Sequence, residues 1–97
     1  DWDLQCEDCG ITIECKRDQV SKTTGNFCFE TKLLKMSLAD YLIYEADKLY
    51  WCSLDDVRYW TSLAIELGFL KERPVGENNT MGYIVNRDDA FAYMRAL

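Results

Sequence analysis

The stretch from residue 53 to residue 70 reads SLDDVRYWTSLAIELGFL and carries the clearest structural signals in the chain. Ser53 and Asp56 resemble a capping box, because the hydroxyl can accept a hydrogen bond from a free amide of the first helical turn. Apolar side chains then recur at helical spacing, at Val57, Trp60, Ala64 and Leu67. Since Gly68 stands where a helix would end, the pattern predicts a helix over residues 54–67.

The segments on either side of this helix extend the pattern. Ser37 and Asp40 form a similar cap, and Leu38, Leu42, Ala46 and Leu49 follow at helical spacing. These positions predict a second helix over residues 38–51, and a short helix is expected before it, at residues 30–35. On the other side, we expect a strand at 69–73, turn formers from 74 to 82 and a returning strand at 83–85. A last helix would follow, capped by Asn86 or Asp88 and carrying Phe91, Met94 and Leu97.

This order of two helices, a β-hairpin and a helix resembles a winged-helix domain over about residues 37–97. In that family a recognition helix often ends in a segment similar to 67–70, and a β-hairpin wing follows it, here residues 69–85. The resemblance implies an α+β fold and a role in recognising DNA or protein. The alternative is a small α+β domain with no such family relation.

The first 30 residues have a different character, with four of the five cysteines and a polar loop. Alternating apolar and polar residues predict a strand at 11–15, and a second strand is expected at 26–30. Because 97 residues leave no length for two independent cores, we interpret the chain as one domain. It would contain a cysteine-rich β-hairpin lobe (1–30) and a winged-helix-like lobe (31–97).

The cysteines suggest a metal site. Residues 6–10 read CEDCG, the spacing and trailing glycine of a zinc knuckle. A closed zinc site needs four ligands and the chain has no histidine, so Cys15 and Cys28 are the natural partners of Cys6 and Cys9. Residues 6–28 therefore resemble a zinc ribbon or a rubredoxin-like knuckle, and that resemblance implies structural zinc, with iron as the alternative metal. Buried thiols, or disulfides in a secreted chain, are the other interpretations.

Composition limits the classes of function. The chain has 11 Lys and Arg against 17 Asp and Glu, a net charge of −6, and no histidine. Catalysis through a histidine triad is excluded, no nucleophile or phosphate-binding motif is present, and we expect a protein that is not an enzyme. The charge disfavours a generic polyanion binder, since such binding needs clustered bases. No apolar run approaches the roughly 20 residues that span a bilayer, so no membrane partner is expected.

Large aromatic residues concentrate between residues 41 and 60. They favour recognition of a protein partner, with Tyr44 and Trp51 as the predicted docking residues, because such rings are enriched at interfaces. The competing interpretation is that they pack in the core. The predicted function is thus an intracellular module in a transcription, replication or nucleic-acid-processing assembly. One alternative is direct DNA binding through Arg58, Lys71, Arg73 and Arg87, and another is a secreted, disulfide-stabilised factor.

Overall fold

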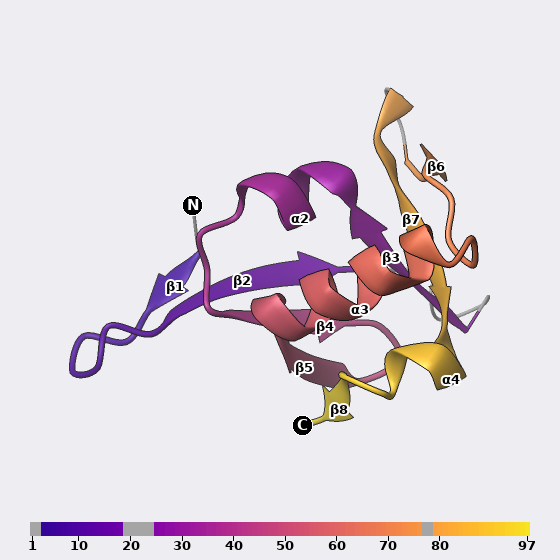
Figure 1. Cartoon of the computed structure of the whole chain (residues 1–97). Helices are drawn as coiled ribbons and strands as arrows, with labels where there is room; N and C mark the ends of the chain where they lie inside the picture. Colours follow the sequence, from indigo (N-terminus) through magenta and orange to yellow (C-terminus); the bar gives the residue numbers. More distant parts are fainter. Residues whose placement is uncertain (1–2, 19–24, 77–78) are drawn as a thin grey trace.

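Two β-sheets and three helices form the part of the chain described by the structure, a computed structural model covering residues 3–18, 25–76 and 79–97. The larger sheet has the spatial order β1 (Leu4–Gln5), β2 (Thr12–Arg17), β4 (Tyr41–Glu45), β5 (Leu49–Ser53) and β8 (Arg95–Ala96). The smaller sheet has the order β3 (Asn26–Glu30), β7 (Met81–Asn86) and β6 (Arg73–Pro74). The helices are α2 (Thr31–Met36), α3 (Leu54–Glu66) and α4 (Arg87–Ala90). The fold is α+β, as predicted (Figure 1).

The connections explain how the two sheets share one core. β2 and β4 are parallel neighbours, and the chain between them forms β3 and α2. All other strand pairs are antiparallel. Because a parallel pair needs a crossover, β3 is carried away from the larger sheet and pairs instead with β7.

An aromatic cluster joins the sheets. The Phe27 ring of β3 meets the rings of Tyr44 and Tyr50 edge to face, with centroids 5.0 and 5.1 Å apart. Phe29 meets Tyr44 in the same way, at 5.8 Å. All four rings are almost completely buried, and full burial of one large apolar side chain stabilises a fold by about 1.5–3 kcal/mol. These rings therefore form the centre of the core.

The predicted helix over 54–67 is confirmed by α3. The Ser53 hydroxyl accepts a hydrogen bond from the Asp56 amide at 3.4 Å, and Leu54 and Val57 are buried. The helix ends before Gly68, whose φ of +81° is one that glycine adopts without strain. The strands expected at 11–15 and 26–30 and the short helix at 30–35 are also present, as β2, β3 and α2. The β-hairpin lobe expected from residues 1–30 is wrong, because β2 pairs with β1 and β4 whereas β3 pairs with β7 in the other sheet.

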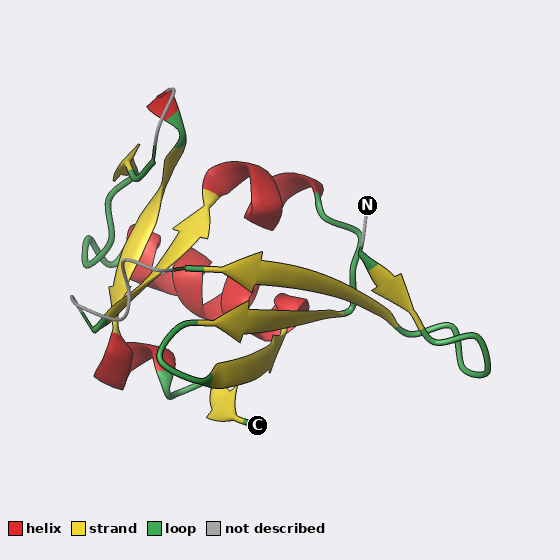
Figure 2. Ribbon diagram, turned by 180° about the vertical axis from the view of Figure 1, so that it is seen from behind, coloured by secondary structure: helices red, strands yellow, loops and turns green. Residues whose placement is uncertain are grey.

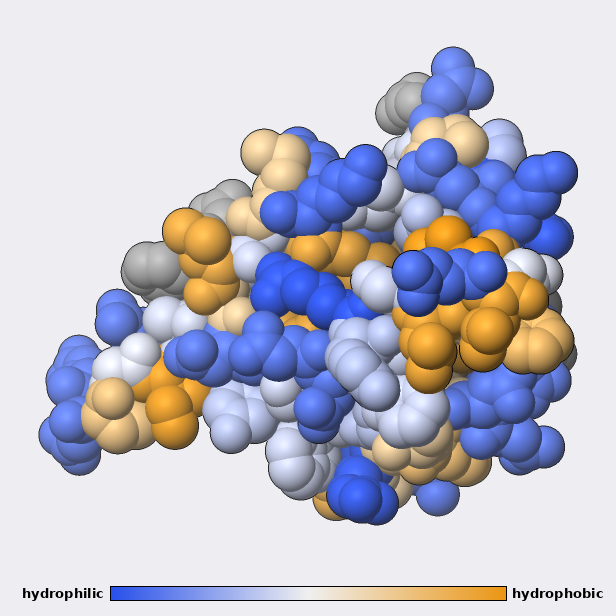
Figure 3. Space-filling model, in the orientation of Figure 1, coloured by the Kyte–Doolittle hydropathy of each residue, from blue (hydrophilic) through white to orange (hydrophobic). Residues whose placement is uncertain are grey.

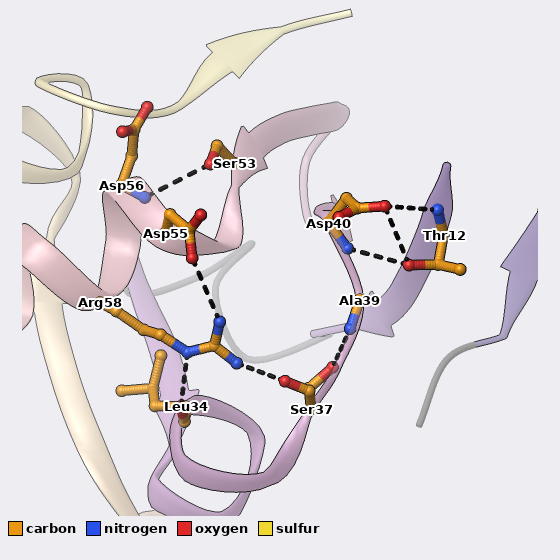
Figure 4. A network of polar contacts seen from close by, with 9 residues as sticks. All are labelled: Thr12, Leu34, Ser37, Ala39, Asp40, Ser53, Asp55, Asp56 and Arg58. Carbon is orange, nitrogen blue, oxygen red and sulfur yellow. Dashed lines mark hydrogen bonds and ion pairs between the residues drawn. The ribbon is translucent and has the colours of Figure 1, made fainter. Parts of the chain in front are cut away.

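The predicted helix over 38–51 is wrong, because this segment forms the β4–β5 hairpin. Burial alternates with the period of a strand: Leu42, Tyr44, Tyr50 and Cys52 face the core, whereas Leu38 and Leu49 of the expected apolar stripe are exposed. Asp40 does not cap a helix. Its carboxylate accepts hydrogen bonds from the Thr12 amide at 3.0 Å and the Thr12 hydroxyl at 3.2 Å, and so fixes the start of β4 beside β2 (Figure 4).

Two smaller predictions are also corrected. The strand expected at 69–73 is reduced to β6, Arg73–Pro74, because residues 69–72 are irregular. The expected hairpin over 69–85 therefore pairs this two-residue strand with β7. The last helix, capped by Asn86 as expected, ends at Ala90, and β8 follows it. The segment expected to form the helix before α3, residues 38–51, contains β4 and most of β5 instead. The winged-helix arrangement is therefore not confirmed. Within the described ranges, no helix combines the length and apolar character needed to cross a membrane.

Candidate functional site

The larger sheet has one apolar face that nothing in the described structure covers. Directly paired residues of neighbouring strands point to the same face, so the strand register defines which side chains lie together. One such row runs through Cys15, Ile43, Trp51 and Arg95. We call this side the outer sheet face, made up of Leu4, Ile13, Cys15, Tyr41, Ile43, Leu49 and Trp51 with the polar Ser53 and the charged Arg17, Glu45 and Arg95.

The figures show why this face is open. In Figure 2, which views the molecule from behind, the strands β2, β4 and β5 lie in front and α3 lies behind them. The helix and the smaller sheet thus pack on the opposite side, where Leu42 and Tyr44 are buried. On the outer sheet face, Trp51 is 37% exposed and Leu49 43% exposed. Trp51 also packs on Tyr41, with ring centroids 6.0 Å apart, which holds the indole in place.

Of the two predicted docking residues, Trp51 lies on this surface and Tyr44 does not. Tyr44 has no exposed surface, so its assignment as a docking residue is wrong and the competing interpretation, core packing, holds for it. Burial, followed by the hydrogen bond that its hydroxyl donates to Asp18, raises the pKa of Tyr44 far above its ordinary value. Sequence reasoning missed Tyr41, Ile43 and Leu49, although the short runs YLIYE (41–45) and LYWCS (49–53), rich in aromatic and β-branched residues, were a usable strand signal.

A second group of exposed apolar residues lies at the end of α3. Figure 3 shows apolar surface gathered over the end of this helix and the loop after it. Its exposed members are Ile65, Leu67 and Phe69, and Phe69 is 79% exposed. Unlike the outer sheet face, this group sits on a helix end and an irregular loop rather than on paired strands.

The four bases predicted for DNA contact are not gathered on one surface. Arg58 donates to the carbonyl of Leu34 at 2.7 Å and to that of Ser37, and so binds the C-terminal end of α2 (Figure 4). A long ion pair of 3.6 Å to Asp55 completes its surroundings. These carbonyls would otherwise lack helical donors, so Arg58 has a structural role.

Arg87 is also held within the fold. Its guanidinium donates to Asp47 at 3.0 and 3.1 Å and to the Tyr50 hydroxyl at 3.2 Å, and it lies over the Phe27 ring at 5.5 Å. The Arg87 hydrogen bonds lower the pKa of Asp47 to about 2. Lys71 and Arg73 are exposed, but the exposed acid Glu72 lies between them in the chain. Two bases in this setting do not form a polyanion-binding surface.

Cys6 and Cys9 meet in the turn between β1 and β2. The Cys9 amide donates a hydrogen bond to the Cys6 sulfur at 3.4 Å, and the Gly10 amide donates to the Cys6 carbonyl at 2.9 Å. Gly10 has a φ of +79°, which favours glycine and lets the turn close. The pKa of the exposed Cys6 thiol is lowered, first by a hydrogen bond from the Cys9 thiol and then by backbone amides of the turn. The turn therefore stabilises a thiolate.

The structure does not bring Cys15 and Cys28 to this turn. Cys15 lies beside Ile43 on the outer sheet face, while Cys28 lies on β3 and Cys52 in the core. Residues 3–18, 25–76 and 79–97 contain no group of three or more Cys, Asp or Glu side chains arranged to hold a metal ion. The single four-cysteine site expected from the sequence is thus not assembled, and no disulfide joins the five cysteines, all of which lie within these ranges.

Comparison with known proteins adds no constraint. No family model, no curated protein and no solved structure matches the chain. What this protein does must therefore be inferred from its own surface and chemistry.

Proposed function

We propose that this protein is a non-catalytic recognition module that docks a partner protein through the outer sheet face. The observation that supports the proposal is the exposed, apolar outer side of a sheet whose inner side already packs on the core. Antiparallel strand pairs with one solvated side, such as β4 and β5 in this mixed sheet, normally carry polar residues there. Here Ile43 and Trp51 occupy neighbouring strands at the centre of that side.

The character of the residues suits protein recognition. Trp and Tyr supply a large share of binding energy at interfaces, and rigid rings lose little conformational entropy on binding. Trp51 packs on the Tyr41 ring, and this contact restricts the orientations open to the indole before a partner arrives. The only ion pair within this face, among the described residues, joins Arg17 to Glu45 at 2.5 Å, so these two charges largely cancel.

Charge indicates the kind of partner. The whole chain carries a net charge of −6, which repels acidic proteins and accelerates association with basic ones. We therefore propose a partner of net positive charge with an apolar docking surface. Association with it should slow as salt concentration rises, because added ions screen the attraction.

Site-specific photo-crosslinking can identify the partner. A photoreactive residue replaces Leu49 on the outer sheet face, and a matched control replaces the exposed Tyr59 on α3, in cells that naturally express the protein. We expect one basic protein to be crosslinked from position 49 and not from position 59. Crosslinking from position 59 alone would contradict the proposal.

Binding by the purified pair then tests the energetics. We expect Trp51→Ala to weaken the affinity at least about tenfold, as for a central interface residue. Trp60→Ala, at a similarly exposed position on α3, should change it less than about twofold. Calorimetric titration measures both, and thermal unfolding confirms that both variants fold. Equal affinities of wild type and Trp51→Ala would show that the outer sheet face does not carry the interaction.

A further inference from the structure

The turn between β1 and β2 presents two thiol groups at the surface of the molecule. In Figures 1 and 2 this turn projects beyond the body of the fold. Cys6 and Cys9 are both exposed, and neither side chain is used by the core. The backbone is already closed around them, since the Cys6 amide donates to the Ile11 carbonyl at 2.7 Å and the Gly10 amide to the Cys6 carbonyl at 2.9 Å.

The hydrogen bonds of the turn favour metal binding by the sulfur atoms. A thiolate, rather than a thiol, is the metal ligand. The Cys9 amide points at the Cys6 sulfur at 3.4 Å, which stabilises negative charge there before any metal arrives. Two cysteines separated by two residues can bind one zinc ion from such a turn.

The same chain cannot complete the coordination in this fold. A structural zinc ion takes four ligands in tetrahedral geometry. The chain contains no histidine, and its other three cysteines lie on β2, on β3 and in the core. Within the described ranges no third Cys, Asp or Glu joins Cys6 and Cys9 in a metal-binding group. The turn is thus half of a four-thiolate site.

We infer that two copies of this chain bind one zinc ion between them, each through Cys6 and Cys9. The partner of this surface is therefore a second copy, because identical turns supply the two missing thiolates. Zinc displaces four thiol protons, and the product is a Zn²⁺ ion bound by four thiolates, with a net charge of −2. No electron is transferred, so no oxidant or reductant is needed.

The charges of the turn make this association depend on the metal. Glu7 and Asp8 lie between the two cysteines of each copy and are exposed. Without a cation, two such turns repel each other, since like charges close together cost free energy. Zinc bridges them through covalent-like bonds to sulfur, and the surrounding carboxylates stay in solvent. The outer sheet face reaches the base of this turn at Leu4 and Ile13, but its central residues, Ile43 and Trp51, lie on β4 and β5, so this inference does not rest on the proposed function.

The test uses the full chain, freed of metal under reducing conditions and then titrated with zinc. Elemental analysis gives the zinc content, and light scattering on a sizing column gives the molar mass. We expect one zinc per two chains, a molar mass that doubles on adding zinc, and reversal by a chelator. Replacing zinc with cobalt should produce the strong absorption of tetrahedral cobalt bound to four sulfurs.

Paired variants locate the ligands. Cys6→Ser with Cys9→Ser should abolish zinc binding and dimer formation, and circular dichroism should show an unchanged fold, because both side chains are exposed. Cys15→Ser with Cys28→Ser should leave both properties intact. One zinc per monomer, lost in both double variants, would instead establish the four-cysteine site within one chain and overturn the inference. Absence of zinc binding, or a dimer that survives the chelator, would overturn it as well.

Discussion

The hydroxyl of Tyr44 accepts a hydrogen bond of 2.8 Å from the backbone amide of Cys28 and so links an inner residue of the larger sheet to the free edge of the smaller one. β3 pairs with β7 on one side only, so its other edge would leave the Cys28 amide without a strand partner. The same hydroxyl donates to Asp18. One side chain thus satisfies a half-buried backbone group at the sheet edge and holds the two sheets together.

Replacing Tyr44 with Phe tests this link. The ring contacts with Phe27 and Phe29 remain, but the Cys28 amide loses its acceptor. We expect the free energy of unfolding to fall by about 1–3 kcal/mol, the usual cost of a buried unsatisfied polar group. Urea denaturation measures the change. Tyr59→Phe, at an exposed position on α3, is the matched control and should change stability by less than about 0.5 kcal/mol. Equal stabilities of the two variants would show that the hydroxyl contributes nothing.

Arg58→Met tests the structural role of Arg58, which the sequence alone had suggested as a DNA contact. The Leu34 and Ser37 carbonyls lose a charged donor, and hydrogen bonds to charged groups contribute about 1.5–3 kcal/mol. We expect a loss of that size in the free energy of unfolding. Arg73→Met, which removes an exposed charge, should have an effect within about 0.5 kcal/mol. The reverse order of the two losses would contradict the assignment.

Stability should fall at alkaline pH through Cys52. Burial raises the pKa of this thiol from an ordinary value of 9.0 to about 12, so the folded state holds its proton longer than the unfolded state does. The contribution of the Cys52 thiol to the free energy of unfolding is fully present below pH 9. It is lost as pH rises from 9 towards 12, with a slope of up to about 1.4 kcal/mol per pH unit.

The comparison with Cys52→Ala isolates this contribution. The variant is less stable at neutral pH, because it leaves a small cavity, but its stability should decline less steeply above pH 9. Chemical denaturation at a series of pH values gives both slopes. A residual slope is expected from Tyr44 and Tyr93, since burial raises the pKa of both. Identical slopes for wild type and variant would refute the role of Cys52.

Thr61 and Thr12 should respond oppositely to the same change. The Thr61 hydroxyl is buried on α3 without a hydrogen-bond partner in the described part of the chain, so Thr61→Val removes an unsatisfied group at nearly equal volume. We expect the free energy of unfolding to rise by about 1 kcal/mol. The Thr12 hydroxyl is bonded to Asp40 at 3.2 Å, and Thr12→Val should lower stability by about 1 kcal/mol. Thermal and urea unfolding of both variants decide the signs.

Local signals were sufficient where they act within a few residues. The Ser53 cap, the apolar spacing after it and the glycine at 68 all operate within α3, and the helix forms as they predict. The same is true of the Asn86 cap, although the helix after it is short because Met94 is drawn into the core and β8 begins at Arg95. The turn at Cys6–Gly10 is equally local, and the structure closes it as the spacing suggests.

The segment 38–51 shows where local reasoning is insufficient. Leu42 satisfies both a helical and a strand period, and a Ser–Asp pair can cap a helix or bind a neighbouring strand. The contact that selects the strand comes from Thr12, 28 positions earlier in the chain. The amide and hydroxyl of Thr12 donate hydrogen bonds to the Asp40 carboxylate. Once that contact aligns β4 with β2, the alternating rows of the sheet determine which residues face the core.

The sequence by itself thus determined α3 and the closed turn that holds Cys6 and Cys9, because each depends on residues close together in the chain. It also indicated the extended segments that become β2 and β3, but not the strands with which they pair. Only the tertiary structure decided that residues 41–53 form a hairpin, that Tyr44 is buried and Trp51 exposed, and that Cys15 and Cys28 lie away from the turn. Those outcomes depend on strand pairing between distant segments. In a strand, a shift of one residue reverses which side chains reach the core, and spacing along one chain does not specify that register.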